Sequence, residues 1–134
     1  MPDRIKRLNP AVLHNPPGYH HVTVVESGRL AFLAGQCPLD PAGAVVDGDI
    51  GAQVDQVVAN ALTALDAAGA RPLDVVRSVI YVVSDDRAVL AGVWRQLNAS
   101  ALGPAFSSAS TLLGVAALGF PGQLVELDLT AALR

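Results

Sequence analysis

Residues 75–83 constrain the fold of this chain more than any other segment. Apart from Arg77 and Ser78, the segment is apolar at both its odd and its even positions. The β-strand that it predicts therefore has two faces to bury. Segments with helical periodicity lie on either side of it along the chain. This arrangement is typical of an α+β domain in which helices cover one face of a sheet.

Both helical segments have a residue that begins a helix, and the first also has one that ends it. Asp49 stands before the first segment as an N-cap, and Gly69 follows it where a left-handed residue is favoured. Asp85 or Asp86 caps the second segment. The predicted apolar stripes are Ile50, Val54, Val57, Val58, Ala61, Leu62 and Leu65 in the first helix, and Val89, Leu90, Val93, Trp94 and Leu97 in the second.

Further strands are predicted before and after the helices. The β-branched residues 22–25 predict one strand, and residues 29–34 its hairpin partner across the turn Ser27-Gly28. Two final strands are expected around residues 110–116 and 124–129. The predicted order is β-β-α-β-α-β-β in a single domain of residues 1–134, in which residues 1–15 form a polar arm and a turn-rich lead-in.

Composition narrows the class of protein. Hydrophobic residues make up 51% of the chain and charged residues 16%, which excludes a disordered chain. Aromatic residues make up only 4%, so Ala, Val and Leu form the core, and association with other subunits is one way to bury the apolar surplus. The single cysteine, Cys37, excludes an internal disulfide framework.

Charge and hydropathy also bear on partners and location. The net charge of −3 and the pI near 5.4 argue against nucleic acid or an anionic membrane as a partner. The only basic cluster, Arg4, Lys6 and Arg7, is interpreted as part of a solvated arm. No segment has the length of a membrane span and the N-terminus starts polar, so we expect a cytoplasmic protein.

The segment around Glu126 carries the most informative candidate chemistry. A period of two places Val125, Leu127 and Leu129 on one face of a strand and Glu126 with Asp128 on the other. Two interpretations remain open. The pair is the solvated face of an edge strand, or a carboxylate lines a cleft, where it orients water or transfers a proton.

The histidines and the cysteine give weaker indications of chemistry. His20 and His21 are neighbours on a predicted strand and point to opposite faces, so they and His14 are interpreted as ordinary polar residues rather than metal ligands. Cys37 has no base or cation beside it in the sequence and is interpreted as a small structural residue. Glycine-rich phosphate-binding motifs do not occur. We therefore expect no metal and no cofactor.

Several short strings, in this order and spacing, make the chain resemble the Rid family of small proteins, also called YjgF-type. The resemblance covers the chain from about Tyr19 to the C-terminus. The strings are PGYHHV at residues 17–22, AGQCPLD at 34–40, GDI at 48–50 with Gln53, AAG at 67–69, DVVR at 74–77, GVAAL at 114–118 and LVEL at 124–127.

The resemblance implies a chorismate-mutase-like mixed sheet packed on two helices, assembled as a homotrimer that binds a small molecule in the clefts between subunits. It also implies hydrolysis of reactive enamines and imines such as 2-aminoacrylate. Glu126 matches the glutamate that positions the attacking water in the family. Tyr19 matches the aromatic residue at the cleft, and the backbone at Gly35 matches a turn of the site.

The arginine that grips the substrate carboxylate in the family is missing here. Ser110 stands in its place in one alignment and Phe106 in another, and no arginine or lysine lies between Gln96 and Leu133. Three further residues depart from the family pattern and make the expected cleft less polar: Ala34, Ala91 and Leu112.

Two hypotheses follow from this mixture of retained and lost residues. The chain is an imine or enamine hydrolase that does not require a carboxylate clamp, or it is a non-catalytic trimer that binds a small molecule. Retention of Glu126 favours the first and loss of the arginine favours the second. The acidic pI argues against the ribonuclease activity sometimes attached to the family.

Overall fold

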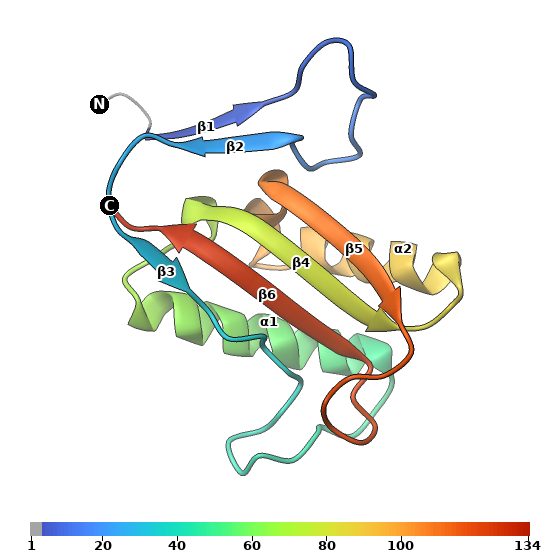
Figure 1. The fold of residues 1–134 in the computed structure, drawn as a ribbon. Helices are drawn as coiled ribbons and strands as arrows, with labels where there is room; N and C mark the ends of the chain where they lie inside the picture. The colour runs from blue at the N-terminus through green and yellow to red at the C-terminus, as the bar shows by residue number, and fades with distance from the viewer. Residues whose placement is uncertain (1–3) are drawn as a thin grey trace.

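The computed structural model describes residues 4–134 and contains two sheets and two helices (Figure 1). In chain order the elements are β1 (Ile5–Leu8), β2 (Val22–Val25), β3 (Leu30–Phe32), α1 (Ile50–Ala67), η1 (Pro72–Asp74), β4 (Val75–Val83), α2 (Arg87–Ala99), η2 (Gly103–Ser107), β5 (Ala109–Val115) and β6 (Val125–Ala132), where η marks a 3-10 helix. The α+β class with a mixed sheet and two helices is as predicted.

The main sheet has the strand order β3-β6-β4-β5. β4 pairs with β5 in parallel and with β6 in antiparallel orientation, and β6 pairs with β3 in antiparallel orientation. Both helices lie behind this sheet in Figure 1 and cover one of its faces. The other face is open apart from its upper part, where the small sheet of β1 and β2 lies.

β4 has the bounds that the sequence predicts, and both of its faces are used. Val75, Ile80 and Val82 are fully buried in the main core between sheet and helices. Val76 packs on the opposite side in a second, smaller cluster with Ile5 and Ala132. The small sheet therefore covers part of the face that the helices leave open.

Both predicted helix caps are confirmed. The Asp49 side chain accepts a hydrogen bond from the Ala52 backbone N–H, and Asp86 accepts one from Ala88. Gly69 has a φ of +77°, the left-handed conformation that ends α1. These caps fix where α1 and α2 start, and α1 in turn holds two segments of the candidate site described below.

The predicted hairpin of residues 21–34 is wrong. β2 pairs with β1, a strand within the predicted polar arm, and β3 pairs with β6 across the main sheet. The observed order therefore has one more strand than predicted. The physical reason is burial: β1 brings Ile5, which is 4% exposed, onto Val76, whereas β3 extends the main sheet beside the apolar C-terminal half of β6.

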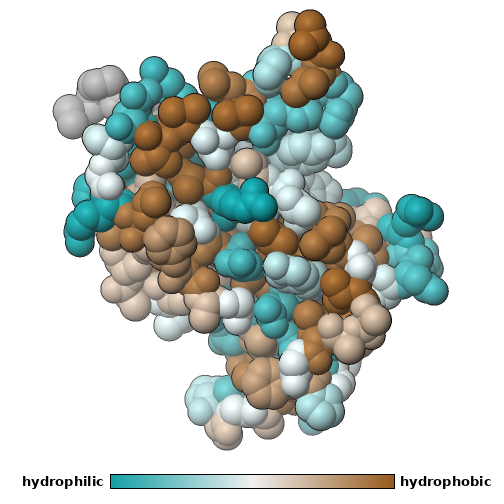
Figure 2. All heavy atoms as spheres, viewed as in Figure 1, coloured by the Kyte–Doolittle hydropathy of each residue, from teal (hydrophilic) through white to brown (hydrophobic). Residues whose placement is uncertain are grey.

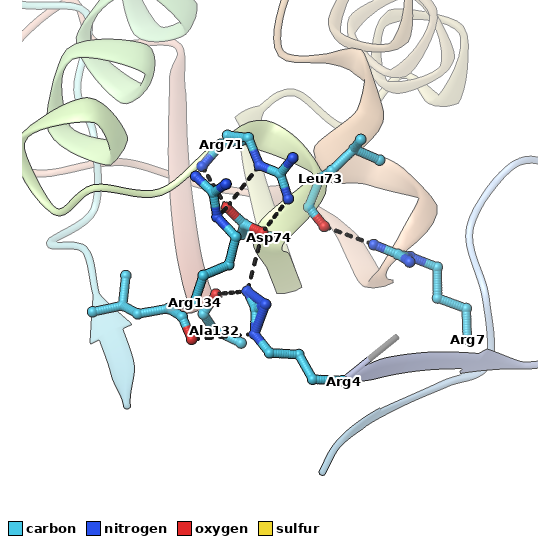
Figure 3. Close-up of polar contacts among 8 residues, drawn as sticks. Arg4, Arg7, Arg71, Leu73, Asp74, Ala132 and Arg134 are labelled. Atoms are coloured by element: carbon cyan, nitrogen blue, oxygen red, sulfur yellow. Dashed lines mark hydrogen bonds and ion pairs between the residues drawn. The ribbon is translucent and has the colours of Figure 1, made fainter. Parts of the chain in front are cut away.

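The basic cluster of the N-terminal segment is not a solvated arm either. Arg4 lies 3.1 Å from the buried carboxylate of Asp74 and donates hydrogen bonds to the carbonyls of Ala132 and Leu133 (Figure 3). Arg71 and Arg134 contact the same carboxylate at 3.1 and 3.7 Å. These contacts fasten the first and last described strands to η1.

The open face of the main sheet is partly apolar. Figure 2 shows brown, hydrophobic atoms over several strands of this face, interrupted by polar side chains. Phe32 in β3 is 76% exposed, and Leu30 and Leu113 are also exposed. Within residues 4–134, no helix is both long and apolar enough to cross a membrane.

Candidate functional site

Glu126 lies on β6, which is an interior strand of the main sheet. Its neighbours Val125 and Leu127 are fully buried on the helix side, so the predicted alternation of faces is confirmed. The interpretation as an edge strand is wrong, because β6 is hydrogen-bonded to β3 on one side and to β4 on the other. Glu126 is half-buried on the open face, directly opposite Tyr81 of β4.

The turn that follows β3 brings a second segment against Glu126. Gln36 pairs with Leu127 through two backbone hydrogen bonds of 2.7 and 3.0 Å. From the other side, the amide nitrogen of Asn60 on α1 donates to the carbonyls of Cys37 and Leu39, both at 3.0 Å. The segment of Gly35 and Cys37 is thus fixed between β6 and α1.

The loop before β6 is fixed in the same way. The buried side chain of Gln53 on α1 donates to the carbonyl of Gly122 at 2.9 Å and accepts from the Leu124 N–H at 2.7 Å. Between these two contacts lies Gln123, whose side chain is itself buried. One face of α1 therefore positions both segments that surround Glu126.

The carboxylate of Glu126 is held by one of its two oxygens. Oε1 accepts from Sγ of Cys37 at 3.2 Å and from Nε2 of Gln123 at 3.1 Å. Oε2 lies over Gly35, where an added Cβ would stand only 2.3 Å away. Glycine therefore leaves the room that the Glu126 carboxylate occupies, and its φ is not positive, so close approach and not backbone conformation favours glycine here.

The Cys37 thiol is not an activated nucleophile. Burial, together with the hydrogen bond to Glu126 and the negative charge of that carboxylate, raises the pKa of Cys37 to about 11. At neutral pH the sulfur therefore keeps its proton and acts as a donor. The sequence contains no base next to Cys37, as noted above, but the fold supplies Glu126 from 89 residues away.

A second group of predicted site residues lies elsewhere. Tyr19, Ser110 and Leu112 line a hollow of about 270 Å³ together with Pro17 and Trp94. The indole of Trp94 donates to the Pro17 carbonyl at 3.2 Å, and its ring meets that of Tyr19 edge to face. The hollow is thus walled by aromatic and apolar groups.

The Ser110 hydroxyl is already engaged. It accepts from the fully buried Ser78 hydroxyl at 2.6 Å and lies 3.1 Å from the carbonyl of Ser108. Ser110 and Leu112 pair with Ser78 and Ile80 of β4 and so share their face of the sheet. That is the helix side.

The predicted site residues therefore form two groups on opposite faces of one sheet. Glu126 with Ala34 and Gly35 lies at the open face and the β3 edge, and the hollow of Tyr19, Ser110 and Leu112 lies at the helix side near β5. Ala91 lies on α2, one turn before Trp94, and does not line the hollow. The two groups do not meet within one subunit.

Three residues of these two groups are not predicted from the sequence. Gln123 has no motif of its own, and only its position three residues before Glu126 connects it with the carboxylate. Trp94 was assigned to the buried stripe of α2, yet it is only half-buried and lines the hollow. Tyr81 lies in the apolar strand β4 and is placed beside Glu126 by strand register.

The histidines lie near the hollow of Tyr19. His14 Nε2 is 3.0 Å from the Tyr19 hydroxyl, and His21 contacts the His14 carbonyl. Within residues 4–134, no group of three or more His, Cys, Asp or Glu side chains is arranged to hold a metal ion.

A mixed sheet packed on two α-helices, with a half-buried carboxylate on β6 and an aromatic hollow beside the edge strand β5, makes this chain a small α+β protein. The endoribonuclease L-PSP family model matches residues 13–133, and the chain belongs to this family, which includes the Rid proteins.

A crystal structure of the Rid-family protein YyfB from Yersinia pestis, described as of unknown function, is similar over 98% of this chain and 100% of its own, with 37% identity and a TM-score of 0.87.

Two curated relatives match only part of the chain. A RutC family protein from Pyrococcus horikoshii is 41% identical over 59 residues, which is 43% of this chain and 47% of the relative. The 2-iminobutanoate/2-iminopropanoate deaminase of Salmonella typhimurium is 32% identical over 62 residues, which is 46% of this chain and 48% of the relative. The chain thus aligns with about half the length of these relatives.

Proposed function

We propose that this protein hydrolyses a small reactive imine, enamine or related electrophile, and that Glu126 positions and deprotonates the attacking water. The arrangement of the carboxylate carries the proposal: Oε1 is held by two neutral donors, and Oε2 lies over the bare backbone of Gly35. The similarity to the Salmonella deaminase supports the reaction class.

The chemistry follows from these two oxygens. Oε2 accepts a proton from water while the water oxygen forms a bond to the imine carbon, and the imine nitrogen takes a proton from solvent. The resulting carbinolamine loses ammonia as its hydroxyl becomes a carbonyl. The hydroxyl proton that is lost when the carbonyl forms returns to solvent. Glu126 returns its proton to the leaving nitrogen, so one imine and one water give one carbonyl compound and one ammonia.

The proposed substrate does not depend on a carboxylate clamp. No arginine or lysine lies between Gln96 and Leu133, so strands β5 and β6 carry no cation for a substrate carboxylate. The hollow near β5 is walled by Tyr19, Trp94 and Leu112 and fits an uncharged, planar group. These side chains support an imine whose recognition is mainly apolar.

We further propose that the active unit is a homotrimer with a small molecule bound in each cleft between subunits. The separation of Glu126 and the hollow supports this assembly, because a neighbouring subunit would supply the half that each subunit lacks. The exposed apolar side chains of Leu30, Phe32 and Leu113 on the open sheet face give such a contact its hydrophobic area. Sedimentation equilibrium should give three times the chain mass, and a monomer at working concentration would refute it.

A non-catalytic role is the alternative. The aromatic hollow lacks a charged group, and a site that binds a small molecule without turning it over needs no more than this. Under this alternative, a ligand binds to the hollow and replacement of Glu126 leaves its affinity unchanged.

The test is ammonia release from imines that an amino-acid oxidase or a β-eliminating lyase generates in the same solution. We expect faster release from imines that lack a carboxylate than from 2-aminoacrylate, and at least a hundredfold loss in Glu126→Gln. Glu26→Gln is the matched control, since Glu26 is the only other glutamate and pairs at the surface with Lys6. Absence of acceleration on every imine, with no effect of Glu126→Gln, would exclude the hydrolase.

A further inference from the structure

The hydrogen bonds of the Glu126 carboxylate are unequal between its two oxygens. Both donors within hydrogen-bonding distance, Cys37 Sγ and Gln123 Nε2, reach Oε1. Oε2 receives no donor from the residues that the structure describes, and it points at the one neighbour that has no side chain, Gly35. A freely hydrated carboxylate has no such difference between its oxygens.

The two donors differ in how firmly they are themselves held. The Gln123 amide is buried, its Nε2 also donates to the Val125 carbonyl at 3.0 Å, and its Oε1 accepts from the Phe120 N–H at 3.2 Å. Its orientation is therefore fixed by the loop. Cys37 is held through its backbone, by Asn60 and by the adjacent pairing of Gln36 with Leu127. Its thiol has two acceptors within reach, and the Glu126 carboxylate at 3.2 Å is nearer than the Gly35 carbonyl at 3.6 Å.

We infer that Cys37 is a positioning residue for the proposed reaction, whose S–H, together with Gln123, anchors Oε1 of Glu126 and leaves Oε2 as the oxygen that takes the proton from water. This inference rests on the proposed function. It assigns the thiol a role as a donor and not as a nucleophile or redox centre.

The chemistry of the thiol agrees with this geometry. Because its pKa is raised to about 11, first by burial and then by Glu126, the sulfur is protonated at neutral pH. Loss of the thiol removes one of two donors to a carboxylate. A hydrogen bond to a charged group is strong enough to keep one rotamer of Glu126 dominant over others.

The thiol itself gives a test that needs no enzymatic activity. Cys37 is the only cysteine of the chain, so the pH dependence of alkylation by iodoacetamide reports its ionisation alone. Glu126→Gln should lower the pKa of Cys37 and accelerate alkylation at pH 9 about tenfold, because the charge is removed while the shape of the side chain is kept. Glu26→Gln should leave the profile unchanged. An unchanged profile in Glu126→Gln would overturn the inference.

The positioning role is tested by two replacements of the cysteine. Cys37→Ser keeps an O–H donor and should retain kcat within about threefold of the wild type. Cys37→Ala removes the donor and should lower kcat about tenfold with KM within twofold, since the substrate contacts remain. Equal kcat in Cys37→Ala and the wild type, or equal losses in Ser and Ala, would overturn the role even where imine hydrolysis itself is confirmed. If the wild type hydrolyses no imine, the proposed function fails, and the alkylation profile still decides whether Cys37 holds Glu126.

Discussion

Replacement of Gly35 by alanine tests the geometry around Glu126 most directly. The added methyl carbon would stand 2.3 Å from Oε2 and 2.8 Å from Cδ of Glu126. Gly35 has no positive φ, so alanine brings no backbone strain and the clash is the only perturbation. Ordinary van der Waals separation requires the oxygen to move by about 1 Å, and a displacement of that size lowers a rate by about a hundredfold.

The assay is ammonia release at saturating imine, with kcat and KM separated. We expect kcat of Gly35→Ala to fall about a hundredfold, which corresponds to about 2.7 kcal/mol in the activation free energy. Because the displaced carboxylate also leaves Cys37, alkylation of the thiol at pH 9 should become faster in the same variant.

Gly119→Ala is the matched control for this substitution. Gly119 has no atom within 4 Å of an added Cβ and no positive φ, so its replacement should leave kcat and the alkylation rate unchanged. Full activity in Gly35→Ala, with the fold intact by circular dichroism, would show that Oε2 does not act from its observed position.

Further predictions concern stability, ligand choice and assembly. Asp74→Asn should lower the free energy of unfolding in urea by about 1.5–3 kcal/mol, because the buried Asp74 side chain loses the charge that faces Arg4, Arg71 and Arg134. Burial alone would raise the pKa of Asp74, but Arg71 and Arg134 hold it below its usual range. The wild type should therefore lose stability as pH falls below about 4, and Asp74→Asn should not show this loss. Ser110→Arg alone should destabilise the fold, because it leaves the buried Ser78 hydroxyl without its acceptor. Ser110→Arg combined with Ser78→Ala should bind 2-keto acids at least tenfold more tightly than the wild type in calorimetry. Phe32→Asp should shift the sedimenting species to a monomer, and an unchanged mass would contradict the proposed contact face.

The parts of the fold that depend on local pattern could be predicted from the sequence. The bounds of β4, the caps Asp49 and Asp86 and the alternation along β6 all follow from residues close together in the chain. The strand pairing of β2 could not. Its partner lies in a short polar segment with a single buried anchor, Ile5, and a turn signal at residues 27–28 favours the wrong neighbour.

The candidate site was predictable to a similar degree. Period two singles out Glu126, and the family resemblance adds Gly35 and Tyr19. The contact of Cys37 with Glu126 depends on the bridge between Gln36 and Leu127, which no local pattern indicates. The same is true of Gln123, because contacts within the loop orient its amide and Gln53 on α1 holds the loop backbone on either side of it.

The division of the site between two faces of one sheet links the proposed activity to assembly. Ser110 on β5 and Glu126 on β6 are separated by β4, about 10 Å across the strands, and by three residues of register, about 10 Å along them. Their side chains point to opposite faces of the sheet. A small imine cannot touch both within one subunit. If both take part, the water-activating half of one subunit must face the aromatic hollow of another. A substitution that separates the subunits would then abolish hydrolysis while it leaves the thiol–carboxylate contact intact, because Cys37, Gln123 and Glu126 all belong to the same chain.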